Sequence, residues 1–164
     1  MKMEVWIIDT RSRKKVIGII SRAERKEMPL KKNGWQFNWR LLFNAEESEY
    51  YKLTLEDTPY QIEGIIMISL MNEEMVYLNN IEVAPHNLGT EGKYENVAGI
   101  LLAYACIQAF EQGIGTYRGY LAFESKTKLI LLYQNKYGAT QAMGQKMFFD
   151  QRAGINLINK YINS

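Results

Sequence analysis

The sequence predicts an α+β domain in which helices flank a mixed, mostly antiparallel sheet with one parallel crossover. In the first half, short apolar and β-branched stretches alternate with turn residues, which is typical of antiparallel strands. A longer apolar stretch, residues 96–112, follows and has helical length. Strand-like segments lie on both sides of it, and a helix that joins two strands of one sheet makes them parallel.

The first forty residues contain three predicted elements. Residues 4–8 predict a short apolar strand, and residues 14–26 predict a helix because Val16, Ile17, Ile20 and Ala23 recur at helical spacing. In residues 35–39 the aromatic side chains alternate at the strand period. Such a strand places Trp35, Phe37 and Trp39 on one face, either as a core layer or as the apolar wall of an acceptor pocket.

The remaining elements follow in order. Residues 50–55 and 62–70 predict antiparallel strands, and residues 71–74 predict a hairpin into a strand that ends at Pro85. After the apolar helix we expect a strand at 117–123, a helix at 126–136 with Ser125 as its N-cap and Gly138 at its end, a strand at 145–149 and a helix at 153–162. No linker, repeat or low-complexity segment interrupts the chain, so residues 1–164 are expected to form one domain.

Composition excludes several classes of function. The 164 residues include 20 basic and 18 acidic side chains, and a net charge of +2 is too weak to predict nucleic-acid or anionic-membrane binding. No run of about 18 apolar residues could span a bilayer, and the charged start does not resemble a signal peptide. We therefore expect a cytoplasmic protein without a membrane partner. Cys106 lies within the apolar helix as a small buried residue, and one cysteine with one histidine predicts no metal site.

The loop before the apolar helix is the first candidate site. It contains two glycines and ends where the helix begins, so backbone N–H groups are exposed at the positive end of a helix dipole. Such a helix start binds phosphate readily. The alternative is a simple connection between strand and helix.

Three local patterns resemble the GNAT superfamily of acetyl-CoA-dependent N-acetyltransferases. IEVAP followed by KYENVAGILL is similar to the family's strand and its Q/R-x-x-G-x-G/A loop, with Lys93 at the first position, Asn96 at the glycine and Ala98 at the last. Asparagine tolerates left-handed backbone better than other non-glycine residues. SKTKLILLYQNKYGA resembles the family's N-x-x-A-x-x-x-Y-x-x-x-G-F helix and places Tyr133 on its tyrosine. QKMFF resembles the closing strand.

The resemblance implies acetyl-CoA as co-substrate and no metal. It implies that the strand ending at residue 84 parts from the strand at 117–123, so that backbone groups of Ile81 and Val83 hold the pantetheine arm. The remaining cofactor-binding residues that it implies are Lys93, Tyr94, Asn96, Val97, Ala98 and Gly99 at the pyrophosphate, with Ser125 and Lys126 at the next helix start.

Acetyl transfer to an amine needs an acid for the departing thiolate and a base for the amine. Tyr133 is the candidate acid, because it matches the family's tyrosine; core packing is the alternative. Glu82 is the candidate base, directly or through water, although it could equally be a surface glutamate. His86 is the second choice for the base, or else a solvated turn residue.

Three functions remain open at this point. The first is direct acetyl transfer to a primary amine of an unidentified small molecule or protein. The second is a catalytically weak GNAT-like module that binds acyl-CoA or a partner and acts in regulation. The third is a protein-directed enzyme of the toxin type. The chain is expected to be a monomer or a homodimer.

Overall fold

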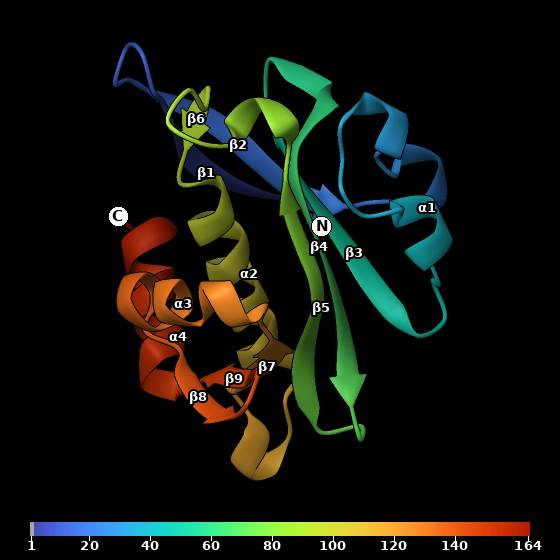
Figure 1. Cartoon of the computed structure of the whole chain (residues 1–164), viewed down its shortest axis with the longest axis vertical. Helices are drawn as coiled ribbons and strands as arrows, with labels where there is room; N and C mark the ends of the chain where they lie inside the picture. The colour runs from blue at the N-terminus through green and yellow to red at the C-terminus, as the bar shows by residue number, and fades with distance from the viewer. Residues whose placement is uncertain (1) are drawn as a thin grey trace. The chain divides into compact units, whose positions relative to one another are not determined.

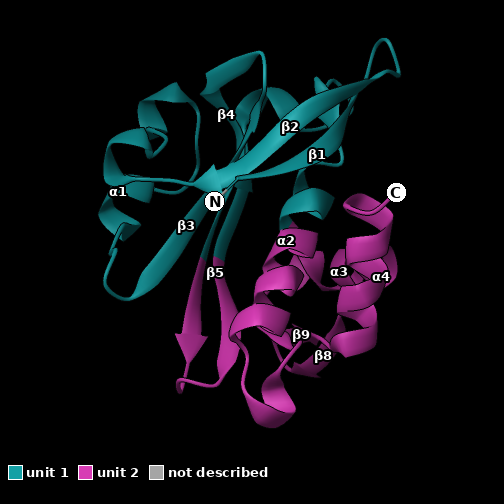
Figure 2. Ribbon diagram, turned by 180° about the vertical axis from the view of Figure 1, so that it is seen from behind, with its two compact units in different colours: residues 1–67, 80–101 teal, residues 68–79, 102–164 magenta. Residues whose placement is uncertain are grey.

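The computed structural model describes residues 2–164 (Figure 1). They fall into two compact units, which Figure 2 shows in different colours. Unit 1 comprises residues 1–67 and 80–101, and unit 2 comprises residues 68–79 and 102–164. The long strands β4 (Thr58–Met71) and β5 (Met75–Val83) and the helix α2 (Val97–Gln112) each contribute residues to both units. The two units are described separately below.

Unit 1 is built on six strands in the order β6-β1-β2-β3-β4-β5. The strands not yet located are β1 (Lys2–Asp9), β2 (Lys15–Arg22), β3 (Ser48–Leu55) and β6 (Tyr94–Glu95). The β1/β2, β2/β3 and β1/β6 pairs are antiparallel. Val5 and Ile7 alternate with more exposed residues along β1, so one face of the strand is buried.

The helix predicted at residues 14–26 is wrong, because most of this segment forms β2. Only Arg25–Glu27 is helical, as one 3-10 turn. The segment is rich in β-branched residues, which favour strands. Its apolar run is short enough to fit either the helical or the strand period. Pairing with β1 decides the outcome, because the two strands form an antiparallel ladder from Lys2 and Ser21 to Ile8 and Lys15. The Ile7 side chain fills the space beside Gly18, where an added Cβ atom would lie 2.6 Å from Ile7 Cδ1.

The strand predicted at residues 35–39 is also wrong. The segment is a loop that leads into the short helix α1 (Trp39–Leu42), where the Asn38 side chain accepts a hydrogen bond from the Leu41 N–H at 3.2 Å. The expected aromatic core layer is nevertheless present. Trp35 and Trp39 are buried in one cluster with Ala23, Met28, Tyr50, Ile65 and Ala84, and Phe37 packs against it.

The hairpin predicted at residues 71–74 is confirmed. Asn72 and Glu73 have φ angles of 53° and 62°, and the Glu74 N–H donates to the Met71 carbonyl at 3.0 Å. Positive φ at both central residues is the geometry of a type I′ turn, which suits the twist of a two-residue hairpin.

Unit 2 contains the strand order β5-β7-β9-β8, with β5 and β7 parallel and the other two pairs antiparallel. Its further elements are β7 (Leu121–Glu124), α3 (Ile130–Tyr137), β8 (Thr140–Met143), β9 (Lys146–Phe149) and α4 (Gln151–Tyr161). A mixed sheet with one parallel pair and flanking helices confirms the predicted α+β class.

Several boundaries in unit 2 differ from the predictions. The strand expected at 117–123 is shorter, because Gly115–Tyr117 forms a 3-10 turn and Gly119 has a φ of 88°. The helix expected from Lys126 begins with a 3-10 turn and becomes α-helical only at Ile130. Strand β8 was not predicted, since its four residues are exposed and carry no apolar alternation.

Helix α2 confirms the prediction of a buried helix. Cys106 is fully buried in it, and burial raises the pKa of its thiol to about 12. It is therefore a packing residue, as expected. Within residues 2–164, none of the helices has the length and apolar character that a membrane span needs.

Candidate functional site

The loop that leads into α2 ends in a residue with left-handed backbone at the helix start. Asn96 adopts a φ of 72°, in the left-handed region, and its carbonyl accepts the first helical hydrogen bond, from the Ile100 N–H at 2.9 Å. The N–H groups of Val97, Ala98 and Gly99 belong to the first helical turn, which has no preceding carbonyls to bond. Asparagine adopts this left-handed conformation more readily than other non-glycine residues do.

The residues before Asn96 are held by backbone hydrogen bonds. The Lys93 N–H donates to the His86 carbonyl at 2.9 Å, and the Thr10 N–H donates to the Lys93 carbonyl at 3.0 Å. The Lys93 ammonium lies 5.4 Å from the centre of the Tyr94 ring. Lys93 and Tyr94 therefore lie in a fixed segment directly before the helix start, within unit 1.

The predicted pantetheine-binding strand is β5. Its parallel ladder with β7 joins Val76, Tyr77 and Leu78 to Leu121, Ala122 and Phe123. Strand β5 continues beyond this ladder to Val83, and both Ile81 and Val83 are partly exposed.

Ser125 and Lys126 belong to unit 2. The prediction of Ser125 as an N-cap is wrong: Lys126 occupies the cap position of the 3-10 turn, and no side chain caps it. The buried Ser125 hydroxyl instead donates to the Lys126 carbonyl at 2.8 Å. A serine hydroxyl can bond to a neighbouring backbone carbonyl in place of capping a helix, and here the segment that follows is a 3-10 turn.

Tyr133 lies on α3 in unit 2, with its ring centre 4.9 Å from that of Phe123 and 6.1 Å from that of Tyr137. Burial raises the pKa of its phenol above the ordinary value of 10.0. Among residues 2–164 its hydroxyl has no hydrogen-bond partner. The ring is thus held by packing, while the hydroxyl keeps its proton at neutral pH.

Glu82, on β5, holds the loop that precedes α1. Its carboxylate accepts hydrogen bonds from the Gln36 N–H at 2.6 Å, the Phe37 N–H at 3.1 Å and the Trp39 indole N–H at 2.9 Å. Both carboxylate oxygens are engaged. These contacts favour a role in holding the loop, because taking a proton would weaken bonds to three donors.

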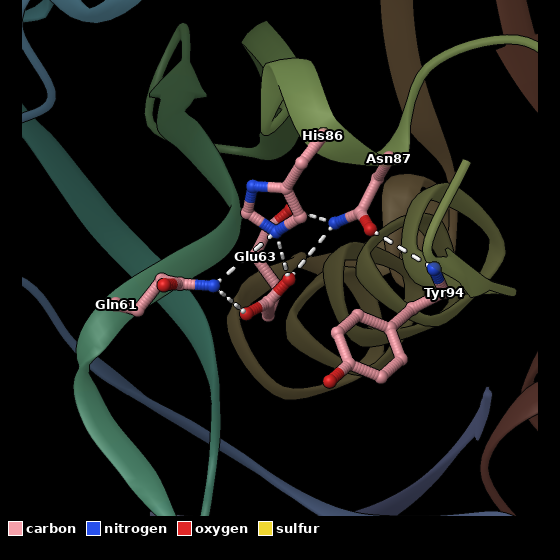
Figure 3. Close-up of polar contacts among 5 residues, drawn as sticks. All are labelled: Gln61, Glu63, His86, Asn87 and Tyr94. Atoms are coloured by element: carbon pink, nitrogen blue, oxygen red, sulfur yellow. Dashed lines mark hydrogen bonds and ion pairs between the residues drawn. The ribbon is translucent and has the colours of Figure 1, made fainter. Parts of the chain in front are cut away.

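A second carboxylate, which the sequence analysis missed, lies next to His86. Glu63 on β4 is fully buried, and one of its oxygens lies 2.6 Å from His86 Nε2 (Figure 3). Gln61 and Asn87 also donate to this carboxylate. The available signal was a single charged residue inside the apolar strand segment IEGIIMI, since an isolated charge on a buried strand requires a partner.

His86 opens onto a cleft of ≈ 590 Å³ in unit 1. The apolar part of its wall comes from Met28, Leu30, Trp35, Ile62 and Ala84. Of the three aromatic residues considered for the wall of an acceptor pocket, Trp35 lines this cleft, whereas Phe37 and Trp39 are not among its lining residues. No group of three or more metal-ligating side chains occurs within residues 2–164.

No protein-family model matches the sequence, and no curated protein matches it. Solved structures do match. A GNAT family acetyltransferase from Elizabethkingia anophelis with acetyl-CoA bound aligns with a TM-score of 0.55 at 16% identity, over 77% of this chain and 78% of that one. A Bacillus subtilis acetyltransferase in complex with CoA aligns with a TM-score of 0.53 at 15% identity, over 80% and 97%.

A third match is a mutant of the AtaT toxin bound to the C-terminus of the antitoxin AtaR and acetyl-CoA. Its TM-score is 0.59 at 14% identity, over 87% of this chain and 98% of that one. The single parallel pair, the buried helix α2 and these similarities show that the chain has the fold of the GNAT acetyltransferases.

Proposed function

We propose that this chain is an acetyltransferase that moves the acetyl group of acetyl-CoA directly to a primary amine. The observation that carries the proposal is the left-handed Asn96 at the start of α2, because the amides of this helix start could bind the pyrophosphate that the resemblance implies there. The amine nitrogen attacks the thioester carbon, the C–S bond breaks, the amine loses a proton and the thiolate gains one. The protein must therefore bind one phosphate-rich ligand and manage two protons.

Different residues of unit 1 bind different parts of acetyl-CoA. Amides of Val97, Ala98 and Gly99 donate to the pyrophosphate, and the Lys93 ammonium adds positive charge beside Tyr94 and Asn96. Backbone groups at Ile81 and Val83 hold the pantetheine arm. The length of β5 beyond its parallel ladder supports this assignment, because strand groups beyond a ladder are available to a ligand. In unit 2, Ser125 and Lys126 complete the proposed set.

Tyr133 is the proposed acid for the thiolate. Its raised pKa supports the role, since the phenol still carries a proton at neutral pH, and its hydroxyl is not engaged elsewhere among the described residues. For the amine's proton the candidates are Glu82 and His86. The three hydrogen bonds that Glu82 accepts count against it as the base.

The acceptor is a small molecule or a protein amine, and we expect it in the cleft of unit 1, in the cytoplasm. Because AtaT is described as a toxin, a protein-directed toxin activity is one version of this proposal. The second candidate function is a partner-binding module. An apolar pocket of ≈ 680 Å³ in unit 2, lined by residues such as Tyr77, Tyr120 and Phe148, supports it.

Two measurements test the proposal. Isothermal calorimetry should show acetyl-CoA binding, and acetyl-CoA should raise the melting temperature, because a ligand that binds only the folded state stabilises it. Release of free coenzyme A should depend on an added amine from a panel of spermidine, kanamycin and a lysine-containing peptide. If acetyl-CoA does not bind at millimolar concentration, the proposed acetyltransferase activity is wrong, and the partner-binding module is the remaining candidate function. Co-purification of a protein partner would distinguish the protein-directed toxin version of the proposal from transfer to a small molecule.

A further inference from the structure

Glu63 is a fully buried carboxylate with three polar side chains as partners. The side chain is 0% exposed, on a strand whose neighbouring residues Ile65 and Ile66 are also fully buried. A carboxylate in such a place is costly unless it is paired and hydrogen-bonded. Three side chains meet this need: Gln61 at 3.0 Å, Asn87 at 3.0 Å and His86 at 2.6 Å.

Asn87 fixes the direction of these bonds. Its Oδ1 accepts from the Tyr94 backbone N–H at 3.1 Å, and a backbone N–H can only donate. The amide group therefore turns its Nδ2 toward Glu63, where it donates both to the carboxylate Oε1 and to the Glu63 backbone carbonyl at 3.1 Å. Glu63 Oε1 is thus an acceptor.

The same oxygen lies 2.6 Å from His86 Nε2, much nearer than the Gln61 amide nitrogen at 3.4 Å, which donates to the other Glu63 oxygen. The imidazole proton therefore lies on Nε2. Its other nitrogen, Nδ1, then keeps a lone pair in the neutral ring. Figure 3 shows Nδ1 turned away from the carboxylate, and no residue within 2–164 hydrogen-bonds to it. The His86 side chain is 34% exposed and lines the cleft of unit 1. The ring that carries this lone pair therefore lies at the wall of the cleft.

We propose that His86 Nδ1 takes the proton from the acceptor amine, and that Glu63 is its positioning residue. This inference rests on the proposed acetyl transfer. As the C–N bond forms, the amine N–H bond breaks and its proton moves to Nδ1, while Glu63 stabilises the resulting imidazolium through Nε2–H. The thiolate takes its proton from a different group. His86 replaces Glu82 as base because its acceptor atom is free, whereas both oxygens of Glu82 are engaged.

The charged groups near His86 come from several elements of unit 1. From β4, Glu63 faces the imidazole, and Tyr60 lines the same cleft. The other charged residues that line the cleft are Lys26, Glu27 and Arg40. Glu27 is paired with Lys52 and Lys26 with Glu24, whereas Arg40 has no ion pair among residues 2–164. Glu63 is therefore the carboxylate placed to offset the positive charge on His86.

The first test uses kinetics with the amine panel described above. His86→Gln keeps an N–H donor for Glu63 but removes the Nδ1 lone pair, so kcat should fall roughly 10²- to 10⁴-fold with acetyl-CoA affinity and melting temperature retained. Imidazole should restore part of the rate to His86→Ala. If wild type transfers acetyl groups and His86→Gln matches its kcat, the assignment of His86 is wrong while the proposed function stands. A wild type that transfers none overturns the proposed function itself.

The second test needs no acceptor. His86 is the only histidine, so a long-range ¹⁵N–¹H spectrum of labelled protein reports its tautomer without ambiguity. We expect Nε2–H and a bare Nδ1 in wild type, and a mixture of tautomers in Glu63→Gln, where the charge-assisted bond is lost. Glu63→Gln should also lower kcat more than it raises KM. A wild-type spectrum with the proton on Nδ1 overturns the proposal.

Discussion

Glu82 Oε1 accepts the Trp39 indole N–H at 2.9 Å, which ties strand β5 to the buried tryptophan at the start of α1. The remaining bonds of this carboxylate go to backbone N–H groups of the same loop. The side chain therefore organises a segment that forms part of the wall of the cleft in unit 1.

Glu82→Gln tests this structural role. An amide offers one acceptor oxygen in place of two and turns its NH₂ toward an N–H donor, so the free energy of unfolding should fall by about 1–3 kcal/mol. Urea denaturation measures the change. Glu46→Gln is the matched control, because Glu46 is exposed and its side chain has no ion pair among residues 2–164; its effect should stay within about 0.5 kcal/mol. Equal stability of both variants would contradict the assigned role.

Asn96 allows a test of the phosphate-binding helix start. Asn96→Gly should keep acetyl-CoA affinity close to wild type, because glycine adopts a φ of 72° without strain. Asn96→Val should weaken binding about 10-fold or more, since a β-branched residue resists left-handed backbone by roughly 1–2 kcal/mol. Calorimetry compares the two variants. Identical affinity in both would show that the helix start does not bind the pyrophosphate.

Tyr133→Phe separates a catalytic hydroxyl from a packing ring. The variant keeps the contacts with Phe123 and Tyr137, and the hydroxyl has no partner to lose among residues 2–164. The melting temperature should therefore barely change, while single-turnover acetyl transfer slows roughly 10²- to 10⁴-fold. Tyr137→Phe, on the next turn of α3, is the control and should keep the wild-type rate. A wild-type rate in Tyr133→Phe would leave solvent as the acid.

Cys106 gives a prediction that depends on pH. Burial raises the pKa of its thiol from 9.0 to about 12, so the folded state favours the protonated form. This contribution to stability is fully present below pH 9.0 and is lost as the pH rises toward about 12, because the unfolded chain releases its proton first. The native protein should also not react with a thiol reagent at pH 8, because Cys106 is buried. The denatured protein should react with one equivalent of the reagent, because the chain has one cysteine. Rapid reaction of the native thiol would show that α2 opens.

Helix α2 and the hairpin at residues 71–74 were predictable because their signals are local. Helix α2 is apolar over its whole length, and the turn at Asn72 and Glu73 lies between two clear strands. The left-handed Asn96 could be expected from one residue type at one motif position. The segments at residues 14–26 and 35–39 were not predictable in this way. Strand β2 owes its form to pairing with β1, so its apolar spacing alone was misleading.

The candidate base shows the same limit. His86 was visible as the only histidine, but its partner Glu63 lies 23 residues earlier, on strand β4. Only the fold brings the two together, and only the Asn87 bond to Tyr94 fixes the direction of the hydrogen bonds. The bonds from residues 36, 37 and 39 to Glu82 are likewise long-range, which is why the sequence could not distinguish a base from a structural carboxylate.

The most direct test of the central claim is a single-turnover reaction of the purified chain with acetyl-CoA and each amine of the panel, followed by mass spectrometry of the amine and quantification of free coenzyme A. The account predicts that at least one amine gains an acetyl group, with one free coenzyme A formed for each acetyl group transferred. Release of coenzyme A at the same rate with and without amine, and no acetylated product, would contradict it.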